Sequence, residues 1–441
     1  MTDISVEETG PAARPAPVSL GQALPTWVRI GCLSFGGPTA QIALMHRVLV
    51  DEKRWLSERQ YLAALSFCML LPGPEAMQLA TYAGWRMHGV FGGLIAGLMF
   101  VLPGALVVLA LAAVYAAFGT VPVVEAVFFG VKAAVLVIVV EALMRIAKRA
   151  LNGWPYLLIA AIAFAAIFVF SLPYPLIVVA AAAYGFASGG SQQPVALQSD
   201  AKLPPWWYAV RTGAVWLMIW IVPLTILAAL TGTTSVFTAL GLFFSKLAVV
   251  TFGGAYAVLA YMAQDVVTAN GWLTAGEMID GLGLAETTPG PLILVTEFVG
   301  YLAAHRHGGE PAWIMGMLGA GVALWATFVP CFLWIFVGAP YIEWIDAQPR
   351  LKRALAAVTA AVVGVVLNLS LWFALHVLFR DVTRIDVWPF HTWAPVVSSL
   401  DWRVVILSAL SGWLLLVRHW GIPQVLGVSA GLALIIVRFP S

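Results

Sequence analysis

The chain has 441 residues, of which 61% are hydrophobic and only 10% are charged. A soluble protein carries about 25% charged residues, so this composition excludes an ordinary soluble enzyme and indicates a protein that lies largely in a lipid bilayer. The formal net charge of +2 gives no sign of a nucleic-acid partner. The cysteines Cys32, Cys68 and Cys331 stand in apolar stretches without metal-type spacing, so we expect all three to be buried, with no metal or cofactor.

The first part of the chain combines a polar start with two interrupted apolar segments. Residues 1–20 are Pro-rich and lack the basic start and apolar core of a signal peptide, so we expect a short disordered cytoplasmic tail. Segments 22–48 and 58–86 follow, and each is broken near its middle, by Phe-Gly-Gly and by Pro-Gly-Pro respectively. Glycine and proline interrupt helices, so each segment is either a broken span or a re-entrant hairpin of two half-helices.

The remaining apolar segments are long enough to predict membrane-spanning helices. Between them lies a polar stretch at 189–205, which we interpret as a cytoplasmic linker. Two further interrupted segments, 239–264 and 275–304, contain a second Phe-Gly-Gly and a second Pro-Gly-Pro. The predicted spans are 90–118, 122–144, 154–170, 174–188, 209–230, 311–339, 353–378, 402–417 and 422–438.

The two sets of motifs reveal an internal duplication. Phe35-Gly36-Gly37 and Phe252-Gly253-Gly254 lie as far apart as Pro72-Gly73-Pro74 and Pro289-Gly290-Pro291, and Trp55 and Trp272 share that distance. Self-similarity at a fixed spacing indicates repeated structural units. We therefore predict a tail (1–20), a first repeat (21–188), a linker with an extra transmembrane helix (189–231) and a second repeat (232–441).

The distribution of basic residues favours one topology over another. If all four interrupted segments are hairpins, most Lys and Arg residues fall on one face, as cytoplasmic loops require. If all four cross fully, these residues divide almost evenly. We therefore favour nine crossings plus four re-entrant hairpins, with thirteen crossings as the alternative. Both models place an odd number of crossings between the copies, so we predict an all-α polytopic membrane protein with a cytoplasmic N-terminus and an inverted repeat.

The broken helices predict a binding site for an anion. Irregular backbone at membrane depth is tolerated where it lines a cavity or is buried in protein, and a half-helix that begins there points free N–H groups at mid-membrane. Because the breaks occur in pairs, they point to one central site. The motif candidates for this site are Phe35, Gly36, Gly37, Pro38, Pro72, Gly73, Pro74, Phe252, Gly253, Gly254, Pro289, Gly290 and Pro291.

Three basic residues within apolar segments are further candidates. Arg29 and Lys246 each stand six positions before a Phe-Gly-Gly motif, and Lys132 lies inside a predicted span. Ionisable residues within a membrane are costly, so they indicate either function or a neutralising partner. Both readings stay open: Arg29 could instead extend to the interface, and Lys132 could pair with a carboxylate.

Polar and acidic residues near the motifs complete the prediction. Gln78, Thr287 and Thr288 could donate hydrogen bonds to the anion. A carboxylate beside the site could carry a proton for coupled transport, and the alternative is a salt-bridge partner or a charge at a helix start. The candidates for proton transfer are Glu75, Glu141 and Glu286, with Asp280 and Glu297 as further acidic residues in these segments.

These motifs resemble those of the chromate ion transporter family in its long, two-domain bacterial form. The stretches "FGGPTAQIALMHRVLVDEKRW" and "LLPGPEAMQLATYAGWRMHG" carry the likeness in the first repeat, and "GWLTAGEMIDGLGLAETTPGPL" carries it in the second. The resemblance covers about 25–378 well. It implies a multi-pass protein of the bacterial inner membrane that exports chromate, confers chromate resistance and is inhibited by the similar dianion sulfate. The second Phe-Gly-Gly is followed by Ala255 where the first has Pro38, so the two breaks need not be equivalent.

The expected partners are therefore chromate, sulfate-like oxyanions and the lipid bilayer, with a homodimer as a further assembly to test. The membrane potential would drive export of a dianion, and proton antiport would add to it. A sulfate or general oxyanion carrier is the alternative within this class. An intramembrane enzyme is the alternative from another class, but the sequence contains no HExxH or GxSxG motif and no paired acidic metal motif.

Overall fold

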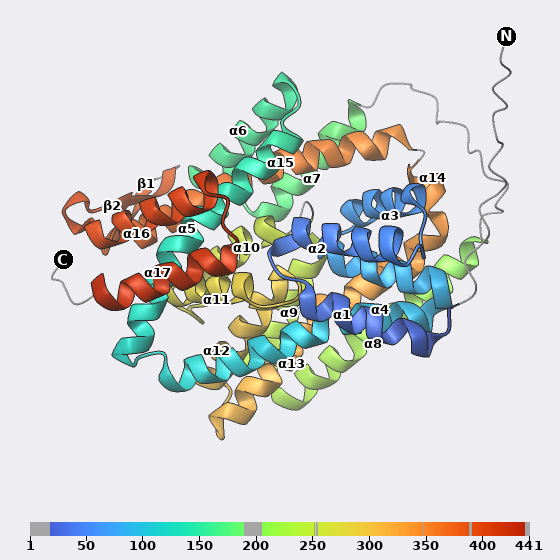
Figure 1. Ribbon diagram of the computed structural model, residues 1–441, viewed down its shortest axis with the longest axis horizontal. Helices are drawn as coiled ribbons and strands as arrows, with labels where there is room; N and C mark the ends of the chain where they lie inside the picture. Colours follow the sequence, from blue (N-terminus) through green and yellow to red (C-terminus); the bar gives the residue numbers. More distant parts are fainter. Residues whose placement is uncertain are drawn as a thin grey trace, which may run out of the picture.

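The computed structural model describes residues 18–188, 205–250, 252, 255–346, 348–387 and 390–436, and this part of the chain is built almost entirely of helices (Figure 1). Most of the predicted tail and the predicted linker lie outside the described residues. The larger elements are α1 (Leu20–Leu33), α2 (Gly37–His46), η1 (Arg47–Glu52), α3 (Glu58–Leu70), α4 (Glu75–Phe118), α5 (Pro122–Ala150), α6 (Trp154–Phe168), α7 (Tyr174–Ala187), α8 (Trp206–Thr231), α9 (Val236–Val250), α10 (Ala255–Gln264), η2 (Asp265–Ala269), α11 (Ala275–Thr287), η3 (Leu292–Leu294), α12 (Val295–His307), α13 (Ala312–Gly338), α15 (Pro349–Leu378), β1 (Val382–Val387), β2 (Phe390–Pro395), α16 (Trp402–Gly412), η6 (Trp413–Val417) and α17 (Ile422–Ile436). Short elements complete the set: η4 (Ala339–Tyr341), α14 (Ile342–Asp346) and η5 (Val397–Ser399).

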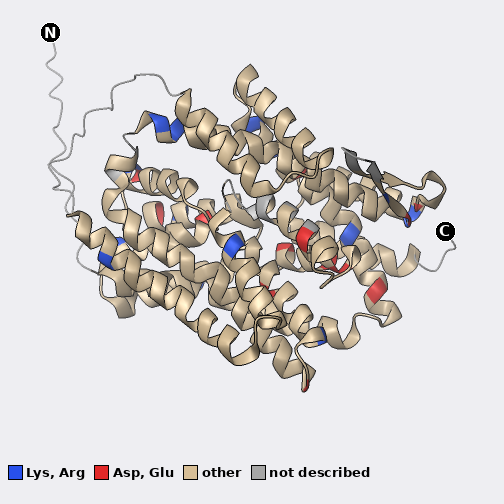
Figure 2. Ribbon diagram, turned by 180° about the vertical axis from the view of Figure 1, so that it is seen from behind, with Lys and Arg blue, Asp and Glu red and all other residues tan. Residues whose placement is uncertain are grey.

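Five helices of the described chain are long and apolar enough to cross a membrane: 75–118, 122–150, 206–231, 312–341 and 349–378. Shorter apolar helices accompany them, including α6, α7, α9 and α17. Figure 2 shows few charged residues along these helices. The chain is therefore an all-α, multi-pass membrane protein, as its composition predicts.

The first interrupted segment folds back on itself. A capping box between Ser19 and Gln22 starts α1, and the break follows at Gly36 and Gly37, whose φ angles of 81° and 75° favour glycine. Beyond the break, α2 and η1 return alongside α1. Arg29 Nη1 lies 3.0 Å from Glu52 Oε2, and Trp27 and Trp55 have ring centroids 5.7 Å apart. The Phe-Gly-Gly motif is thus the tip of a hairpin.

The second interrupted segment leads into another reversal of the chain. After α3, the Pro-Gly-Pro break has φ 118° at Gly73, and α4 begins at Glu75. Non-helical backbone at His88 and Gly89 then divides α4, so that residues 75–87 run antiparallel to residues 90–118. The two parts touch closely, because a Cβ at Gly84 would lie 2.3 Å from the Gly92 carbonyl oxygen. By this register, the motif lies beside the middle of 90–118.

The second half of the chain has the same layout. A capping box between Thr274 and Glu277 starts α11, at the position that corresponds to the capping box of α3. The π-helical η2 follows α10 as η1 follows α2. The rings of Phe243 and Trp272 lie 5.6 Å apart, like the tryptophan pair of the first hairpin. After the second Pro-Gly-Pro, α12 packs closely against α13, where a Cβ at Gly300 would lie 2.6 Å from the Gly319 carbonyl oxygen.

The two halves are packed through small residues and exchange their outer helices. Residues 90–118 of α4 run antiparallel to α13, with a Cβ at Gly97 falling 2.6 Å from the Phe332 ring. Helices α6 and α7 pack on α15, whereas α16 and α17 pack on α5. Glycines permit both contacts: Gly364 meets the Ala160 carbonyl, and Gly130 meets the Ser429 carbonyl.

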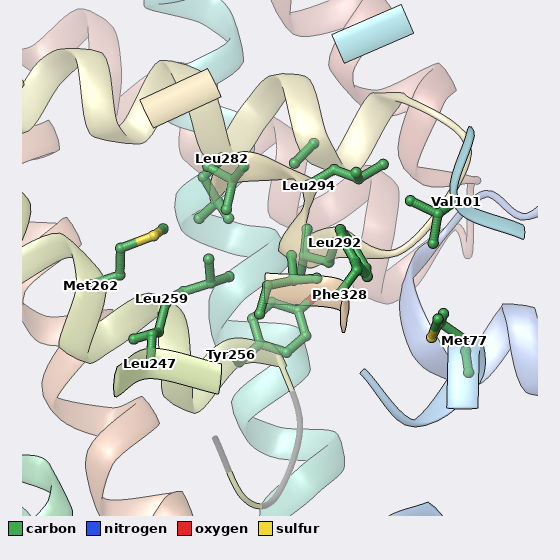
Figure 3. Close-up of a cluster of buried hydrophobic side chains, with 14 of the residues drawn as sticks. Met77, Val101, Leu247, Tyr256, Leu259, Met262, Leu282, Leu292, Leu294 and Phe328 are labelled. Carbon is green, nitrogen blue, oxygen red and sulfur yellow. The ribbon is translucent and has the colours of Figure 1, made fainter. Parts of the chain in front are cut away.

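The core lies where the halves meet. In Figure 3, Tyr256 and Leu259 of α10 lie beside Leu292 of η3 and Phe328 of α13, with Val101 of α4 nearby. These side chains belong to one cluster of buried hydrophobic residues, in which Leu259 is fully buried and Leu292 is 2% exposed. Because the cluster draws on both halves, neither half has a separate core.

Two features differ from the sequence-based expectations. Cys68 and Cys331 are buried, but the prediction for Cys32 was wrong, because this residue is exposed near the end of α1. The antiparallel hairpin of β1 and β2, in which Thr383 pairs with Ala394, was not expected from the sequence. This hairpin lies in the polar connection between α15 and α16, where no apolar period signals a strand.

The ion pairs of Asp401 at the start of α16 predict how the stability of the protein changes with pH. Asp401 accepts hydrogen bonds from Arg403 and pairs with Arg380 at 3.1 Å, and hydrogen bonds from Arg403 lower the pKa of Asp401 to about 2. We expect Asp401→Asn to reduce the free energy of unfolding by about 1–2 kcal/mol at neutral pH. The difference from wild type should persist above the unfolded-state pKa of about 4 and vanish as pH falls toward about 2. Thermal unfolding of both proteins in detergent across this pH range measures the difference in stability. A difference that stays unchanged at low pH would contradict the stabilising role of the ionised Asp401.

Candidate functional site

A cavity of about 830 Å³ lies where the first Pro-Gly-Pro and the first Phe-Gly-Gly approach each other. Pro38, Gly73 and Glu75 of the predicted site line it, and the second half of the chain contributes Tyr256 of α10 and Thr359 of α15. The last turns of α5 add a basic wall to the cavity, formed by Arg145, Lys148 and Arg149. With Glu75 as the acidic residue of the lining, the cavity has an excess of positive charge and suits an anion.

Two half-helices begin at this cavity. Helix α2 starts at Gly37 with Pro38 in its first turn, and α4 starts at Glu75 after Pro74. A proline in the first turn lacks an N–H group, but that group would have no hydrogen-bond partner within the helix in any case. The other free N–H groups and the positive end of each helix dipole remain available to a negatively charged ligand.

Buried glutamines fix the loops that form these helix starts. The Gly290 N–H donates to the Ser34 carbonyl at 2.9 Å, so the first Phe-Gly-Gly is joined to the second Pro-Gly-Pro. Gln41 strengthens this link by donating from Nε2 to the Gly290 carbonyl at 2.7 Å. Gln78 donates in the same way to the Pro72 carbonyl at 2.7 Å. Both glutamines are almost fully buried, so each loop is held by a hydrogen bond that water does not weaken.

The two Pro-Gly-Pro loops make reciprocal contacts with the opposite half. A Cβ at Gly73 would lie 2.9 Å from the Cys331 Sγ in α13, and a Cβ at Gly104 in α4 would lie 2.1 Å from the Pro289 carbonyl oxygen. Gly73 corresponds to Gly290 in the duplication, and Gly104 corresponds to Cys331. Each loop thus packs against the middle of the long helix that follows the other loop.

The predicted basic residues are not brought together. Arg29 pairs with Glu52 and does not line the large cavity. Lys132 lies 3.2 Å from Asp280 Oδ2, which also accepts from the Tyr115 hydroxyl at 2.8 Å, and this cluster lines a second cavity of about 590 Å³. Lys246 lines a third cavity, of about 240 Å³, and its Nζ lies 5.4 Å from the centre of the Tyr261 ring.

The predicted acidic residues lie in three different environments. Glu75 lines the large cavity at the start of α4. Glu141 pairs with Arg145 one turn later on α5, as the salt-bridge alternative expects. Glu286 is 2% exposed and accepts a hydrogen bond at 2.8 Å from Tyr256, a residue of the cavity wall.

The remaining predicted residues serve mainly the backbone of the breaks. Phe35 and Gly36 line a separate cavity of about 430 Å³ together with Glu141. The hydroxyls of Thr287 and Thr288 donate to carbonyls of their own helix. The Phe252 carbonyl accepts from the Tyr174 hydroxyl at 3.2 Å, and Pro291 immediately precedes η3. Gly253 and Gly254 lie outside the described residues.

Four residues of this region were not identified from the sequence as candidates for the site. Arg145, Lys148 and Arg149 entered it only as part of the charge on one face, because a basic cluster at a helix end is usually solvated. Gln41 was overlooked, although it follows the first Phe-Gly-Gly by one turn as Gln78 follows the first Pro-Gly-Pro. A buried polar residue one turn beyond a helix break was the available signal.

Broken helices that begin at one cavity within a polytopic helical protein are typical of membrane transporters. The family model described as "Chromate transporter" matches residues 21–186 and 238–436, and the chain belongs to this family. The chromate transport protein of Pseudomonas aeruginosa is 33% identical over 419 residues, which cover 91% of this chain and 94% of that protein.

Two further relatives extend the comparison. The chromate transport protein of Cupriavidus metallidurans is 32% identical over 355 residues, or 79% of this chain and 81% of the relative. The uncharacterized transporter YwrA of Bacillus subtilis is 30% identical over 156 residues, which cover 88% of its length but only 35% of this chain. No solved structure matches the chain.

Proposed function

We propose that this chromate transporter family member exports chromate through the 830 Å³ cavity. The supporting observation is that two half-helix N-termini and the basic wall of Arg145, Lys148 and Arg149 surround one space lined by both halves. A tetrahedral dianion is stabilised by free N–H groups, helix dipoles and guanidinium groups together. We assign anion binding to this basic wall in place of Arg29, which pairs with Glu52 and does not line the cavity.

We also propose that the two repeats are inverted relative to each other. Supporting this, corresponding helices 90–118 and α13 run antiparallel in contact, and the Pro-Gly-Pro loops make reciprocal contacts across them. The outer helices are exchanged in a similarly reciprocal way, because α6 and α7 of the first half pack on α15, whereas α16 and α17 of the second half pack on α5. YwrA, with a matched region of about one repeat, supports residues 21–188 and 232–441 as the units of duplication.

The orientation follows from charge. The cavity is lined by Lys148, Arg149 and Asn152 around the C-terminal end of α5, and basic helix ends and loops of membrane proteins face the cytoplasm. We therefore place this end and the N-terminus in the cytoplasm, and the protein in the bacterial inner membrane. A dianion leaving an inside-negative cell gains about 2.3 kcal/mol per charge per 100 mV, or roughly 4–5 kcal/mol in total, so the potential alone supports export.

Transport into everted membrane vesicles tests this proposal. We expect chromate uptake to rise with a lumen-positive potential, to stop when the potential is dissipated, and to be inhibited by sulfate. Sulfate uptake, measured in parallel, tests the general oxyanion carrier. If vesicles with the protein take up no more chromate than empty vesicles, the proposed function is wrong.

The basic wall can be tested in the same assay. We expect the double variant Lys148→Gln/Arg149→Gln to reduce chromate uptake at least about tenfold at low concentration, since it removes two charges from the binding cavity. Arg211→Gln, which changes a basic residue of α8 outside the cavity lining, is the control. Equal uptake by the double variant and the control, at equal expression, would contradict a role of the basic wall in binding chromate.

A further inference from the structure

Glu286 is a buried carboxyl group whose environment does not suit a charge. It lies in the last turn of α11, where the helix dipole presents its negative end. Its Oε1 accepts from the Tyr256 hydroxyl at 2.8 Å, while its Oε2 is buried without a hydrogen-bond partner. Among the residues that the structure describes, no Lys or Arg forms an ion pair with it.

The charged groups that act on Glu286 are a cation and a carboxylate that already pair with each other. Helix α5 contributes Arg145 and Glu141, which are paired with each other, and α10 contributes Tyr256. Helices α4 and α12 also pack against α11, and they carry Glu75 and Glu297 respectively, neither of which is a cation. Glu297 is 1% exposed and makes no ion pair among the described residues. The residues of α15 that line the 830 Å³ cavity are Ala356 and Thr359, which carry no charge. The sequences of α17 and η3 contain no ionisable residue. Arg145, the cation whose charge acts on Glu286, is thus already paired with Glu141, and among the described residues it forms no ion pair with Glu286.

Tyr256 connects this carboxyl group to the cavity. The tyrosine lines the 830 Å³ cavity, and its hydroxyl donates to Glu286. A dianion in the cavity therefore acts on the carboxyl group across a single side chain and in a region of low dielectric, where like charges repel strongly. Protonated Glu286 relieves that repulsion, whereas ionised Glu286 opposes the anion.

We infer that Glu286 is a proton site linked to the cavity: oxyanion binding and protonation of Glu286 reinforce each other. The inference rests on the proposed function, since it requires an oxyanion in this cavity. By thermodynamic reciprocity, a proton that strengthens anion binding must itself be bound more tightly when the anion is present. Anion binding is then accompanied by proton uptake, which gives the carrier a means of coupling its cycle to pH.

Glu75 is the rival for this role because it lines the cavity directly. It stands at the start of α4, however, where the helix dipole stabilises a carboxylate, and the positive charge of Arg149 acts on it. The helix dipole thus supports the charged form of Glu75, whereas the dipole of α11 opposes the charged form of Glu286. The two carboxyl groups can be separated by substitution with glutamine, which has the shape of the protonated acid.

Selenate binding to the purified protein provides the test, because this tetrahedral dianion keeps its charge across the range studied. We expect equilibrium dialysis to show wild-type affinity rising as pH falls from about 8 to about 5, by at most about tenfold per pH unit, the limit for one linked proton. Glu286→Gln should bind with the low-pH affinity at every pH. Its Oε1 can still accept from Tyr256, so the fold should be retained.

A second readout and two controls decide the outcome. On addition of selenate, wild type should take up protons from weakly buffered solution, and Glu286→Gln should not. Glu125→Gln, which changes a residue of the 590 Å³ cavity, should behave as wild type. If Glu75→Gln abolishes the pH dependence and Glu286→Gln does not, or if wild-type binding is independent of pH, the inference is overturned while the anion site stands. If wild type binds no selenate at any pH, the anion site itself is contradicted.

Discussion

Gly104→Ala should abolish transport and lower the stability of the protein by at least about 2–3 kcal/mol. A Cβ at this position of α4 would lie 2.1 Å from the Pro289 carbonyl oxygen, far inside the contact distance of real atoms. The second Pro-Gly-Pro loop would have to move. Because Gly290 donates to the Ser34 carbonyl and Gln41 donates to the Gly290 carbonyl, this movement would also disturb the first Phe-Gly-Gly.

A control substitution at a second helical glycine shows whether the effect of Gly104→Ala comes from the close contact with the Pro289 carbonyl. Gly321 lies in α13 and has no atom within 4 Å of the position that a Cβ would take. Gly321→Ala should therefore be neutral or stabilise the helix by up to about 1 kcal/mol. Thermal unfolding in detergent and chromate uptake would be measured for both variants. A Gly104→Ala protein that unfolds and transports like Gly321→Ala would refute the close packing of the loop on α4.

The ion pair of Lys132 and Asp280 carries the second large effect. It joins α5 of the first half to α11 of the second half, and Tyr115 of α4 donates to the same carboxylate. The side chain of Asp280 is 5% exposed and that of Lys132 is 28% exposed. We expect Lys132→Met to destabilise the protein by about 2–4 kcal/mol, somewhat less than for a fully buried pair, because the remaining carboxylate is left without its cation.

A double variant distinguishes the loss of an interaction from the exposure of a lone charge. Lys132→Met/Asp280→Asn removes both charges, and the amide oxygen introduced in place of the carboxylate can still accept from Tyr115, so stability should recover much of the loss. The temperature of unfolding is measured for Lys132→Met, for Asp280→Asn and for the double variant. Additive losses in the double variant would mean that the two residues do not depend on each other.

The sequence predicted the parts of this fold that follow from local chemistry. Glycines with positive φ, such as Gly36, Gly73 and Gly290, break helices for reasons that act within a few residues, so these interruptions could be read directly. The hairpin form of the first segment could be inferred from charge, and the pair of Arg29 and Glu52 supports it. The exchange of outer helices between the halves was not foreseen, since apolar helices carry no signal that selects a partner.

Predictions of the site were less complete because pairing depends on tertiary contacts. Arg29 and Lys132 looked alike in the sequence as cations in apolar segments. The structure gives Lys132 the carboxylate partner that one of the two readings expected, and it pairs Arg29 with Glu52 of the same hairpin, which was not foreseen. Lys148 and Arg149 looked like ordinary interfacial charges, and only the fold shows that they border a cavity. The sequence indicated Glu286 as a candidate, but its hydrogen bond with Tyr256 depends on how α10 and α11 pack in the fold.

Protection of an engineered thiol by selenate tests most directly whether the cavity at the helix breaks holds the oxyanion. Thr39→Cys places the thiol in the 830 Å³ cavity and Thr120→Cys places it in the 590 Å³ cavity, both with Cys32→Ser to remove the exposed native thiol. Selenate should slow modification by a charged thiol reagent at Thr39→Cys and leave Thr120→Cys unchanged. Equal rates with and without selenate at Thr39→Cys, or equal protection at both positions, would contradict an oxyanion site in this cavity.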